Sequence, residues 1–361
     1  MTKIVKIGII GSGGIAGSHA NAYLAMDDVQ IVAVTDVVPG KAQEFINKFG
    51  IKGAQAFEDH KQMLELDIDG VSICTPNIAH HITSIDALQA GKNVLVEKPL
   101  SVTLDQGIEM VQVAKQTGKI LTVGFQPRYD LNMQTVTNIV KSGQLGDVYY
   151  VEVGGGRRRG MPDGTFINKA LAGAGAMVDI GTYSLDLALN ALGHPKPLTV
   201  SAYTSNHFGT NPKYHPQADK FEVEDFGVAM IRLEGGIILN FKISWAMHMD
   251  TLGPTLFLGK DAGLKLTVSG SGPWSGAWDG GLESINMFHD IDGQHTETAI
   301  PIQNHGINIF DAKVRDFVVA VKEGKPAPIP GEEILYNQAI LDGIFRSSEI
   351  GKEVDIHIPI I

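Results

Sequence analysis

The first residues in this sequence whose types and spacing suggest a binding site form a glycine-rich loop close to the N-terminus. Residues 11–16, Gly-Ser-Gly-Gly-Ile-Ala, have the spacing G-x-G-x-x-[GA] and directly follow the apolar run 4–10. In this spacing the first glycine turns the chain sharply, the second lets backbone approach a pyrophosphate, and the small third residue lets a helix lie close to a sheet. The N–H groups that start this helix would point at the phosphates. The loop therefore predicts a dinucleotide site formed by Gly11, Ser12, Gly13, Gly14 and Ile15.

Asp36 closes the next strand-like run, about 20 residues beyond Ala16, where a carboxylate can bond the ribose 2′-hydroxyl of a dinucleotide. Val37, Val38 and Pro39 follow it, and no arginine stands beside it to receive a 2′-phosphate. A carboxylate would repel that phosphate. We therefore expect NAD as the cofactor, in preference to NADP.

Further polar residues stand where other strand-like runs end. They are Thr75, Asn77 and His80, then Glu97 and Lys98, and then Gln126. The carboxyl ends of parallel strands border the ligand crevice, so hydroxyl and amide groups there could bond ribose or nicotinamide. Burying a charged side chain is costly, so a Glu-Lys pair at the end of an apolar strand is expected to face a cleft. The alternatives are a proline turn with an Asn helix cap at Thr75–Asn77, and a merely exposed lysine at Lys98.

Asp179 and Tyr183 lie four residues apart in a helical stretch, so they are expected on one helix face. A phenol has an ordinary pKa near 10, and an ammonium such as Lys98 within about 4–6 Å would lower it and favour the phenolate. The alternative is an acid at a helix start and a tyrosine in the core.

Four side chains are candidates to contact a substrate. They are Arg128, Arg157, Trp245 and His248. An arginine could grip a carboxylate or phosphate with two hydrogen bonds, and Trp245 and His248 could stack on or bond a sugar. A solvated loop or an inter-subunit salt bridge for Arg157, and a core position for Trp245, are equally open. No group of His, Asp and Glu has the spacing of metal ligands, so no catalytic metal is expected.

The elements that must position these residues change character along the chain. Strand-like runs at 4–10, 31–36, 70–75, 93–97 and 120–125 alternate with helical stretches near 16–26, 41–48, 59–66, 79–90 and 104–115. Such alternation predicts a doubly wound parallel sheet covered on both faces. Beyond the helical stretches near 131–141 and 178–192, residues 198–299 are mostly strand-like, with a hairpin of 228–233 and 237–243, and two helices close the chain. We expect an α/β protein with a Rossmann domain at 1–127 and an α+β domain at 128–361, with a large, mostly antiparallel open sheet and a last helix free to pack back on the first domain.

Composition narrows the classes of protein. The 361 residues are 43% hydrophobic and carry a net charge of −11, which opposes nucleic acid or an anionic membrane as partner. One cysteine, Cys74, excludes a disulfide framework, and neither a signal peptide nor a membrane span is recognisable. A cytoplasmic protein is expected. An open sheet has one face left to cover, which favours a homodimer or homotetramer.

Together, the motifs Gly-x-Gly-Gly-x-Ala, Thr-Pro-Asn-x-x-His, Glu-Lys-Pro, Gly-Phe-Gln-x-Arg and Asp-x-Gly-x-Tyr give the whole chain a close similarity to a family. The chain resembles the glucose–fructose oxidoreductase/inositol dehydrogenase/MocA (Gfo/Idh/MocA) family. The resemblance implies NAD(P)-dependent oxidation or reduction of sugars and polyols, with Lys98 as the catalytic lysine and Asp179 and Tyr183 completing the site. Many members carry His where this chain has Tyr183, which makes an inositol dehydrogenase the less favoured assignment.

The expected function is hydride transfer between NAD and a sugar, polyol or sugar derivative, with Tyr183 exchanging the hydroxyl proton and Asp179 orienting the hydroxyl or the lysine. Two alternatives remain open. Some relatives use bound NAD transiently to cleave glycosidic bonds, and a protein of another class would sense NAD and regulate a partner without catalysis.

Overall fold

A computed structural model describes residues 4–268, 281–304, 306 and 308–358 of the chain. The chain divides into two compact units. The first unit is Met1–Gln126 with Ile307–Leu335 and Ile361, and the second is Pro127–Gly306 with Tyr336–Ile360. Residues 307–335, which we assigned by sequence to the C-terminal domain, thus belong to the first unit.

The described part of the first unit contains a six-stranded sheet in the order β3-β2-β1-β4-β5-β6, with every neighbouring pair parallel. The strands are β1 Val5–Ile10, β2 Val29–Thr35, β3 Gln55–Phe57, β4 Gly70–Ile73, β5 Asn93–Val96 and β6 Leu121–Val123. With right-handed crossovers, this order places the connecting helices on both faces of the sheet. The carboxyl ends of β1, β4 and β5 therefore lie at one edge, where the loops that follow them meet.

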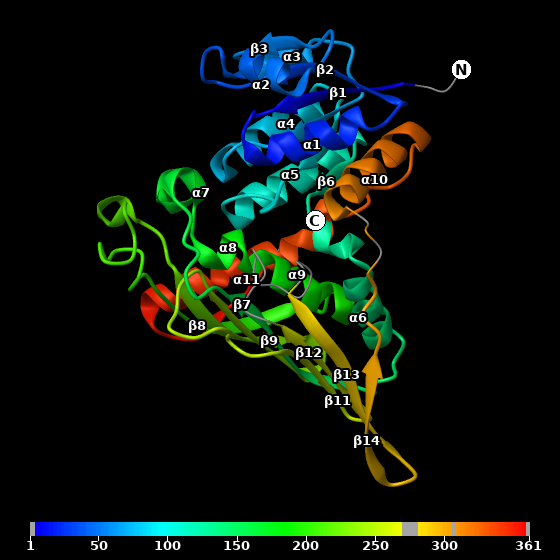
Figure 1. The fold of residues 1–361 in the computed structure, drawn as a ribbon, viewed down its shortest axis with the longest axis vertical. Coiled ribbons are helices and arrows are strands. Elements are labelled where there is room, and N and C mark those ends of the chain that lie inside the picture. The colour runs from blue at the N-terminus through cyan, green and yellow to red at the C-terminus, as the bar shows by residue number, and fades with distance from the viewer. Residues whose placement is uncertain (1–3, 269–280, 305, 307, 359–361) are drawn as a thin grey trace. The chain divides into compact units, whose positions relative to one another are not determined.

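Helices join successive strands of this sheet (Figure 1). They are α1 Gly14–Leu24, α2 Lys41–Phe49, α3 His60–Leu64, α4 His80–Gln89 and α5 Leu104–Thr117. The C-terminal α10, Ile309–Glu323, is orange in Figure 1 and packs beside α1. Its Val314, Phe317 and Val318 are fully buried in the same core cluster as residues of β1 and α1. Burial of this apolar face explains why α10 belongs to the first unit.

The described part of the second unit contains a nine-stranded sheet in the order β14-β13-β12-β11-β7-β10-β9-β8-β15. The strands are β7 Val148–Gly156, β8 Pro197–Ser205, β9 Phe226–Leu233, β10 Ile237–Ser244, β11 Thr255–Gly259, β12 Ala262–Val268, β13 Leu282–Ile291, β14 Gln294–Ile300 and β15 Val354–Asp355. Only β7 and β10 pair in parallel among these strands. The expected α/β class and the expected hairpin, now β9 and β10, are confirmed.

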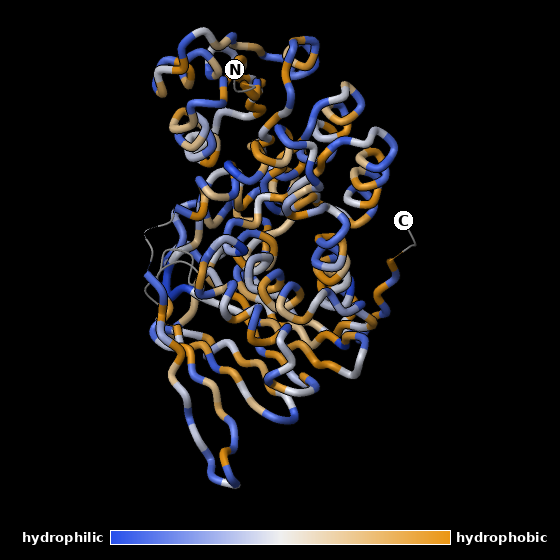
Figure 2. The backbone as a smooth tube through the Cα atoms, turned by 90° about the vertical axis from the view of Figure 1, so that its right-hand side faces the viewer, coloured by the Kyte–Doolittle hydropathy of each residue, from blue (hydrophilic) through white to orange (hydrophobic). Residues whose placement is uncertain are grey.

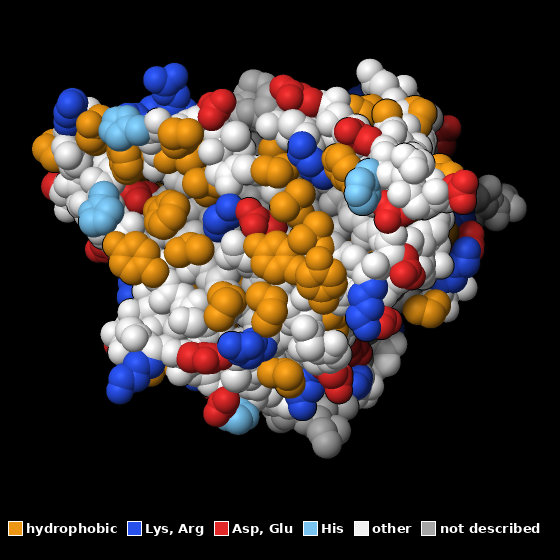
Figure 3. Space-filling view, turned by 90° about the horizontal axis from the view of Figure 1, so that it is seen from below, with side chains coloured by type: hydrophobic (Ala, Val, Ile, Leu, Met, Phe, Trp, Pro, Cys, Tyr) orange, Lys and Arg blue, Asp and Glu red, His pale blue; other side chains and the backbone are white. Residues whose placement is uncertain are grey.

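Helices pack on one face of the nine-stranded sheet. They are α8 Ala176–Asp179 and α9 Gly181–Leu192, with α6 Leu131–Lys141 packed on α9, and the C-terminal part of α11 Gly331–Ile350. The short α7 Lys169–Ala172 contacts the 3-10 turn Gly164–Ile167. Along β9 and β10, buried and partly exposed residues alternate, and Figure 2 shows the matching alternation of hydropathy along the long strands. Inward side chains such as Leu239 and Phe241 are fully buried against α8 and α9. The opposite face carries the partly exposed set, and Figure 3 shows hydrophobic side chains gathered there around a few charged ones.

No helix in the described ranges is both long and apolar enough to span a bilayer.

Candidate active site

The glycine loop after β1 forms a cradle at the start of α1. Gly11 has φ +87°, and a Cβ there would lie 2.8 Å from backbone atoms of Cys74 and Thr75, so only glycine fits. Gly13 and Gly14 are exposed, and a Cβ on either would meet no atom within 4 Å. The first turn of α1 carries no acidic residue, and Gly13 provides no side-chain cap. The N-terminus of α1 therefore suits a pyrophosphate, as a dinucleotide site requires.

The carboxylate of Asp36 turns back onto this loop. Its Oδ2 accepts hydrogen bonds from the Ser12 N–H at 3.0 Å and the Ser12 hydroxyl at 2.6 Å, while Oδ1 accepts one from the Val38 N–H at 3.0 Å. Burial would raise the pKa of Asp36, but these hydrogen bonds and the ammonium of Lys41 lower it below its ordinary value. The loop and the acid that we predicted separately are thus one hydrogen-bonded unit.

Lys41 is a residue of this site that we missed in the sequence. Its Nζ lies 3.1 Å from Oδ2 of Asp36, and the lysine is about half as exposed as a free side chain, at 44%. We looked for an arginine directly after Asp36, whereas this cation comes from the first residue of α2. A lysine that opens the helix after the acidic residue is the feature that could have revealed it.

The residues after β4 occupy the same edge of the sheet. The hydroxyl of Thr75 is buried, and it has no hydrogen-bond partner among the described residues, as expected of a group that bonds a ligand. Asn77 opens the 3-10 turn Asn77–Ala79 and is half-buried. His80, the third predicted residue after β4, bonds backbone on both sides. Its buried ring lies with Nδ1 2.7 Å from the carbonyl oxygen of Pro99 and Nε2 3.1 Å from that of Thr75, so it contacts the backbone of two loops at this edge of the sheet.

Lys98 and Glu97 follow β5 and differ in burial. Lys98 is half-buried, and the peptide bond that joins it to Pro99 is cis. The Glu97 carboxylate is only 5% exposed and bonds the internal side chains His19 and Lys313. We had expected Glu97 to bind the cofactor. Its side chain is committed to the interior because two polar partners from α1 and α10 lie there.

Gln126 and Arg128 follow β6. Gln126 is buried at 1% exposure. The Arg128 guanidinium, which we had assigned to the substrate, bonds the buried carboxylate of Asp186 through Nε at 2.9 Å and Nη2 at 2.8 Å. A guanidinium fork engaged with a carboxylate in this way joins the 3-10 turn Gln126–Tyr129 to α9. Arg128 is therefore a structural bridge within the second unit.

Asp179 and Tyr183 lie at a break between two helices. Asp179 ends α8, and Tyr183 lies in the first turn of α9, so the single continuous helix that we expected is interrupted at Ile180. Both side chains are largely buried, at 8% and 4% exposure. The indole Nε1–H of the fully buried Trp245 donates to Oδ2 of Asp179 at 3.2 Å. Trp245, one of the expected substrate residues, thus directly contacts the expected catalytic acid.

Glu224 fixes the segment that leads into Asp179, and we did not predict its part. Its carboxylate accepts hydrogen bonds from the N–H groups of Gly175 at 2.8 Å and Met177 at 3.0 Å. Burial raises the pKa of Glu224 to about 7, although these N–H groups oppose the shift. A carboxylate that holds the start of α8 limits the movement of Asp179 at its end.

The arginine run lies beside the residues that follow β10. Arg157 is half-buried, and its Nη1 donates to the carbonyl of Gly160 at 2.8 Å. Arg159, which pairs with Ala246 across an isolated bridge, lies with its Nη2 3.2 Å from Nδ1 of His248. Its guanidinium carbon also lies 4.9 Å from the ring centroids of both Phe208 and Tyr214. His248 is exposed, so this basic and aromatic cluster borders solvent next to Trp245.

A parallel sheet in the order 3-2-1-4-5-6, with a glycine cradle at its first helix and an acid at the end of its second strand, defines a Rossmann dinucleotide-binding protein. A family model described as "Oxidoreductase family, NAD-binding Rossmann fold" matches residues 5–125, and the model of the GFO/IDH/MocA C-terminal domain matches 133–272. The chain belongs to the GFO/IDH/MocA family of oxidoreductases.

Relatives are similar over nearly the whole length. A D-glucoside 3-dehydrogenase of Escherichia coli (strain K12) is 29% identical, over 98% of this chain and 97% of its own. A scyllo-inositol 2-dehydrogenase (NADP(+)) of Bacillus subtilis (strain 168) is 23% identical, over 96% and 94%. The structure of a levoglucosan dehydrogenase in complex with NADH has the same fold, with a TM-score of 0.82 at 20% identity over 98% of this chain and 100% of that one.

Proposed function

We propose that this chain is an NAD-dependent dehydrogenase or reductase acting on the CH–OH group of a sugar, polyol or sugar derivative. The observation that carries the proposal is the open cradle at the start of α1, with the ionised Asp36 beside it, in a chain similar over 98% of its length to a D-glucoside 3-dehydrogenase. The cofactor would be held by residues 11–15, Asp36, Thr75, Asn77 and Gln126.

The chemical steps are assigned to three side chains. When bound, the cofactor supplies the hydride acceptor or donor. In the oxidative direction, Tyr183 takes the hydroxyl proton of the substrate as the carbon loses its hydride, and in reduction it returns the proton. We assign to the Lys98 ammonium the stabilisation of the Tyr183 phenolate, and to Asp179, held by Trp245, the orientation of the substrate hydroxyl.

The test is NAD reduction across aldoses, glycosides, inositols, anhydrosugars and sugar acids, with Lys98→Met and a matched Lys92→Met. Lys92 directly precedes β5, at the end opposite to Lys98, and its Nζ donates to the backbone carbonyl of Leu66. Lys98→Met is expected to abolish turnover while NAD still binds, and Lys92→Met to retain it. Turnover of Lys98→Met at the wild-type rate would overturn the assignment. Release of free sugar without NADH would indicate the glycosidic alternative, and NAD binding without turnover of any sugar would favour an NAD sensor.

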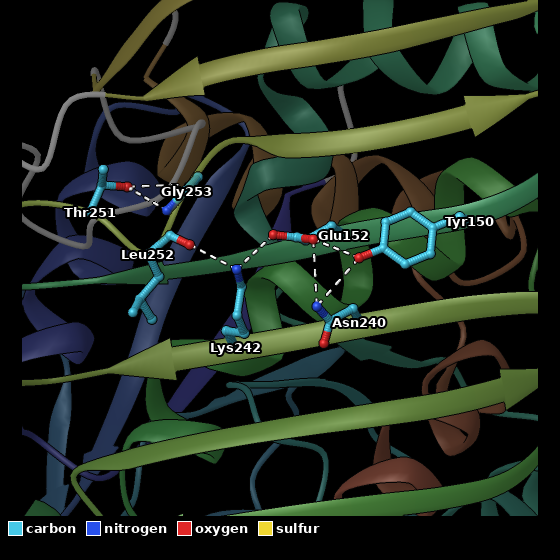
Figure 4. A network of polar contacts seen from close by, with 7 residues as sticks. All are labelled: Tyr150, Glu152, Asn240, Lys242, Thr251, Leu252 and Gly253. Carbon is cyan, nitrogen blue, oxygen red and sulfur yellow. Dashed lines mark hydrogen bonds and ion pairs between the residues drawn. The ribbon is translucent and has the colours of Figure 1, made fainter.

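We further propose that a second copy of the chain covers the open face of the nine-stranded sheet. Tyr203, Met230 and Phe288 are 52%, 41% and 39% exposed on this face. Glu152 lies among the same rows of side chains and bonds Lys242 at 2.6 Å, Tyr150 at 2.6 Å and Asn240 at 3.5 Å (Figure 4). Since these charges are already paired within the chain, an apolar partner surface could bury them without leaving an isolated charge.

Light scattering after gel filtration tests this pairing. Met230→Lys is expected to give monomers, because it places an unpaired charge in the interface. Met249→Lys changes a methionine that is 61% exposed and follows β10, and is expected to leave the assembly unchanged. A monomeric wild type, or an unchanged mass for Met230→Lys, would refute the proposed interface.

A further inference from the structure

A chain of buried polar side chains runs through the first unit and ends at Glu97. The Glu97 Oε1 accepts hydrogen bonds from Nζ of Lys313 and from Nε2 of His19, the latter at 2.8 Å. Nδ1 of His19 lies 3.0 Å from the Ser72 hydroxyl, which lies 2.7 Å from the Tyr23 hydroxyl. The residues come from α1, β4, α10 and the position directly after β5, and none is more than 5% exposed.

One arrangement of protons satisfies every bond in this chain. Burial and the nearby Lys313 ammonium lower the pKa of His19, so its ring is neutral. Burial opposes ionisation of Glu97, but the Lys313 charge and the His19 hydrogen bond hold its pKa well below the ordinary range. The neutral ring then donates from Nε2 to Glu97 and accepts at Nδ1 from Ser72, whose oxygen accepts from Tyr23. One carboxylate and one ammonium remain, and they compensate each other.

The carboxylate is also enclosed by backbone. The Glu97 N–H donates to the carbonyl of Ile73 at 3.0 Å, so Glu97 continues the ladder of β5 with β4. On the other side, a Cβ on Gly124 would lie 2.9 Å from Oε1 of Glu97 and 3.1 Å from its Cδ. Glu97 therefore has little room to move, and its side chain stays in the interior.

The position of Glu97 constrains its neighbour. Glu97 and Lys98 share one peptide unit, so a Glu97 that is held both at its carboxylate and at its backbone N–H restricts where the backbone of Lys98 can lie. Lys313 reaches this point from α10, 216 residues along the chain. A shift of the lysine amine by about 1 Å can cost about 100-fold in rate, which makes its anchoring consequential.

We propose that Lys313 is a positioning residue for Lys98, and that it acts through the buried carboxylate of Glu97. The catalytic part of this inference rests on the function proposed above for Lys98, whereas the positioning part does not. Besides packing against α1, α10 thus contributes Lys313, which fixes the position of Glu97 directly after β5.

The experiment compares Lys313→Met with Lys322→Met. Lys322 lies on the same helix and bonds Asp28 near the surface at 2.8 Å, so its loss removes a cation of α10 without touching Glu97. The first readout uses the protein without substrate. Acetic anhydride labels lysine amines in proportion to their accessibility and free-amine fraction, and peptide mass spectrometry reports the rate at Lys98, with Lys92 as an internal reference.

In Lys313→Met we expect the labelling rate of Lys98 to change at least threefold and that of Lys92 to stay constant, with kcat lowered about 10- to 100-fold and the NAD dissociation constant within about twofold. Lys313→Arg keeps the charge and is expected to restore most of both properties, and Lys322→Met to change neither. A folded Lys313→Met with wild-type labelling of Lys98 would overturn the proposal.

If Lys313→Met does not fold, the double variant Glu97→Gln/Lys313→Met is used in its place, because it removes both buried charges. It is compared with Lys322→Met by the same labelling of Lys98 and Lys92. Wild-type labelling of Lys98 in the double variant would overturn the proposal equally, and altered labelling with constant Lys92 would support it. The proposed function fails separately, through a wild type that turns over no sugar, because the labelling does not depend on turnover.

Discussion

Removal of the Lys41 ammonium should sharpen the preference for NAD over NADP. Nζ of Lys41 lies 3.1 Å from Oδ2 of Asp36, beside the position where the ribose 2′ substituent is expected. A 2′-phosphate there would be repelled by the Asp36 carboxylate, and the more exposed Lys41 ammonium offsets part of that repulsion. In Lys41→Ala the Asp36 carboxylate acts on the phosphate alone.

The size of the effect follows from the charges. Two unit charges about 5 Å apart interact by about 3 kcal/mol at an effective dielectric constant of about 20. Since Lys41 is 44% exposed, solvent screening reduces the change to about 1–2 kcal/mol. This energy corresponds to an increase of about 5- to 30-fold in the ratio of the NADPH and NADH dissociation constants.

Fluorescence titration of NADH and NADPH measures both constants, and the change should shrink as salt is raised. Lys48→Ala is the matched control, because Lys48 lies on the same helix and its ammonium faces the ring of Phe49. Asp36→Ala should shift the ratio the other way, since Lys41 would then attract the phosphate unopposed. A ratio within twofold of wild type in Lys41→Ala would refute the electrostatic reasoning, and a wild type that binds NADP as tightly as NAD would refute the proposed cofactor preference.

Three further outcomes are expected. Trp245→Phe removes the indole N–H that donates to Asp179. A hydrogen bond to a charged group is worth about 1.5–3 kcal/mol, so kcat/KM should fall at least about 10-fold in steady-state assays. An unchanged kcat/KM would show that this hydrogen bond does not contribute to catalysis. Asp28→Asn should lower the free energy of unfolding by about 1 kcal/mol at pH 7 after allowance for screening. Hydrogen bonds from two cations of α10 lower the pKa of Asp28 to about 2, so this stabilisation is present above the ordinary carboxyl pKa and should vanish as pH falls through 2 in urea titrations. Burial raises the pKa of Glu224 to about 7, so the free energy of unfolding should fall as the pH rises from 4.5 to 7, by about 3 kcal/mol at most. Glu224→Gln should make this dependence on pH weaker, and an equal dependence in both proteins would contradict the raised pKa.

The first unit was the most predictable part of the molecule because its main features are local. A glycine that must adopt φ +87° and a helix that must approach the sheet leave a fixed spacing in the sequence, and Gly11 and Ala16 have it. The hairpin of β9 and β10 was equally accessible, because alternating residues and Glu234-Gly235-Gly236 lie within one short stretch.

Contacts between distant residues could not be predicted in this way. Asp186 lies 58 residues from Arg128, and Trp245 lies 66 residues from Asp179. Such pairs depend on which elements the topology makes neighbours. The break between α8 and α9 at Ile180 could not be predicted either. The carboxylate that bonds the start of α8 belongs to Glu224, which follows β8 and is distant in sequence.

The sequence was least informative where a charged or polar residue also has partners in the interior. A carboxylate or an imidazole at the end of a strand is a residue type that binding sites use. A folded chain also needs these groups in its interior, where they compensate buried charges and bond buried carbonyls. We predicted Glu97 and His80 as cofactor residues from their positions, and the sequence did not reveal that His19 and Lys313 bond the first or that two backbone carbonyls lie beside the second. The two uses are connected at this site. In the positioning proposed above, the internal carboxylate of Glu97 holds the chain just after β5 and thereby gives the next residue, Lys98, a defined place. The residue types alone could not distinguish a side chain that anchors the site from one that binds a ligand.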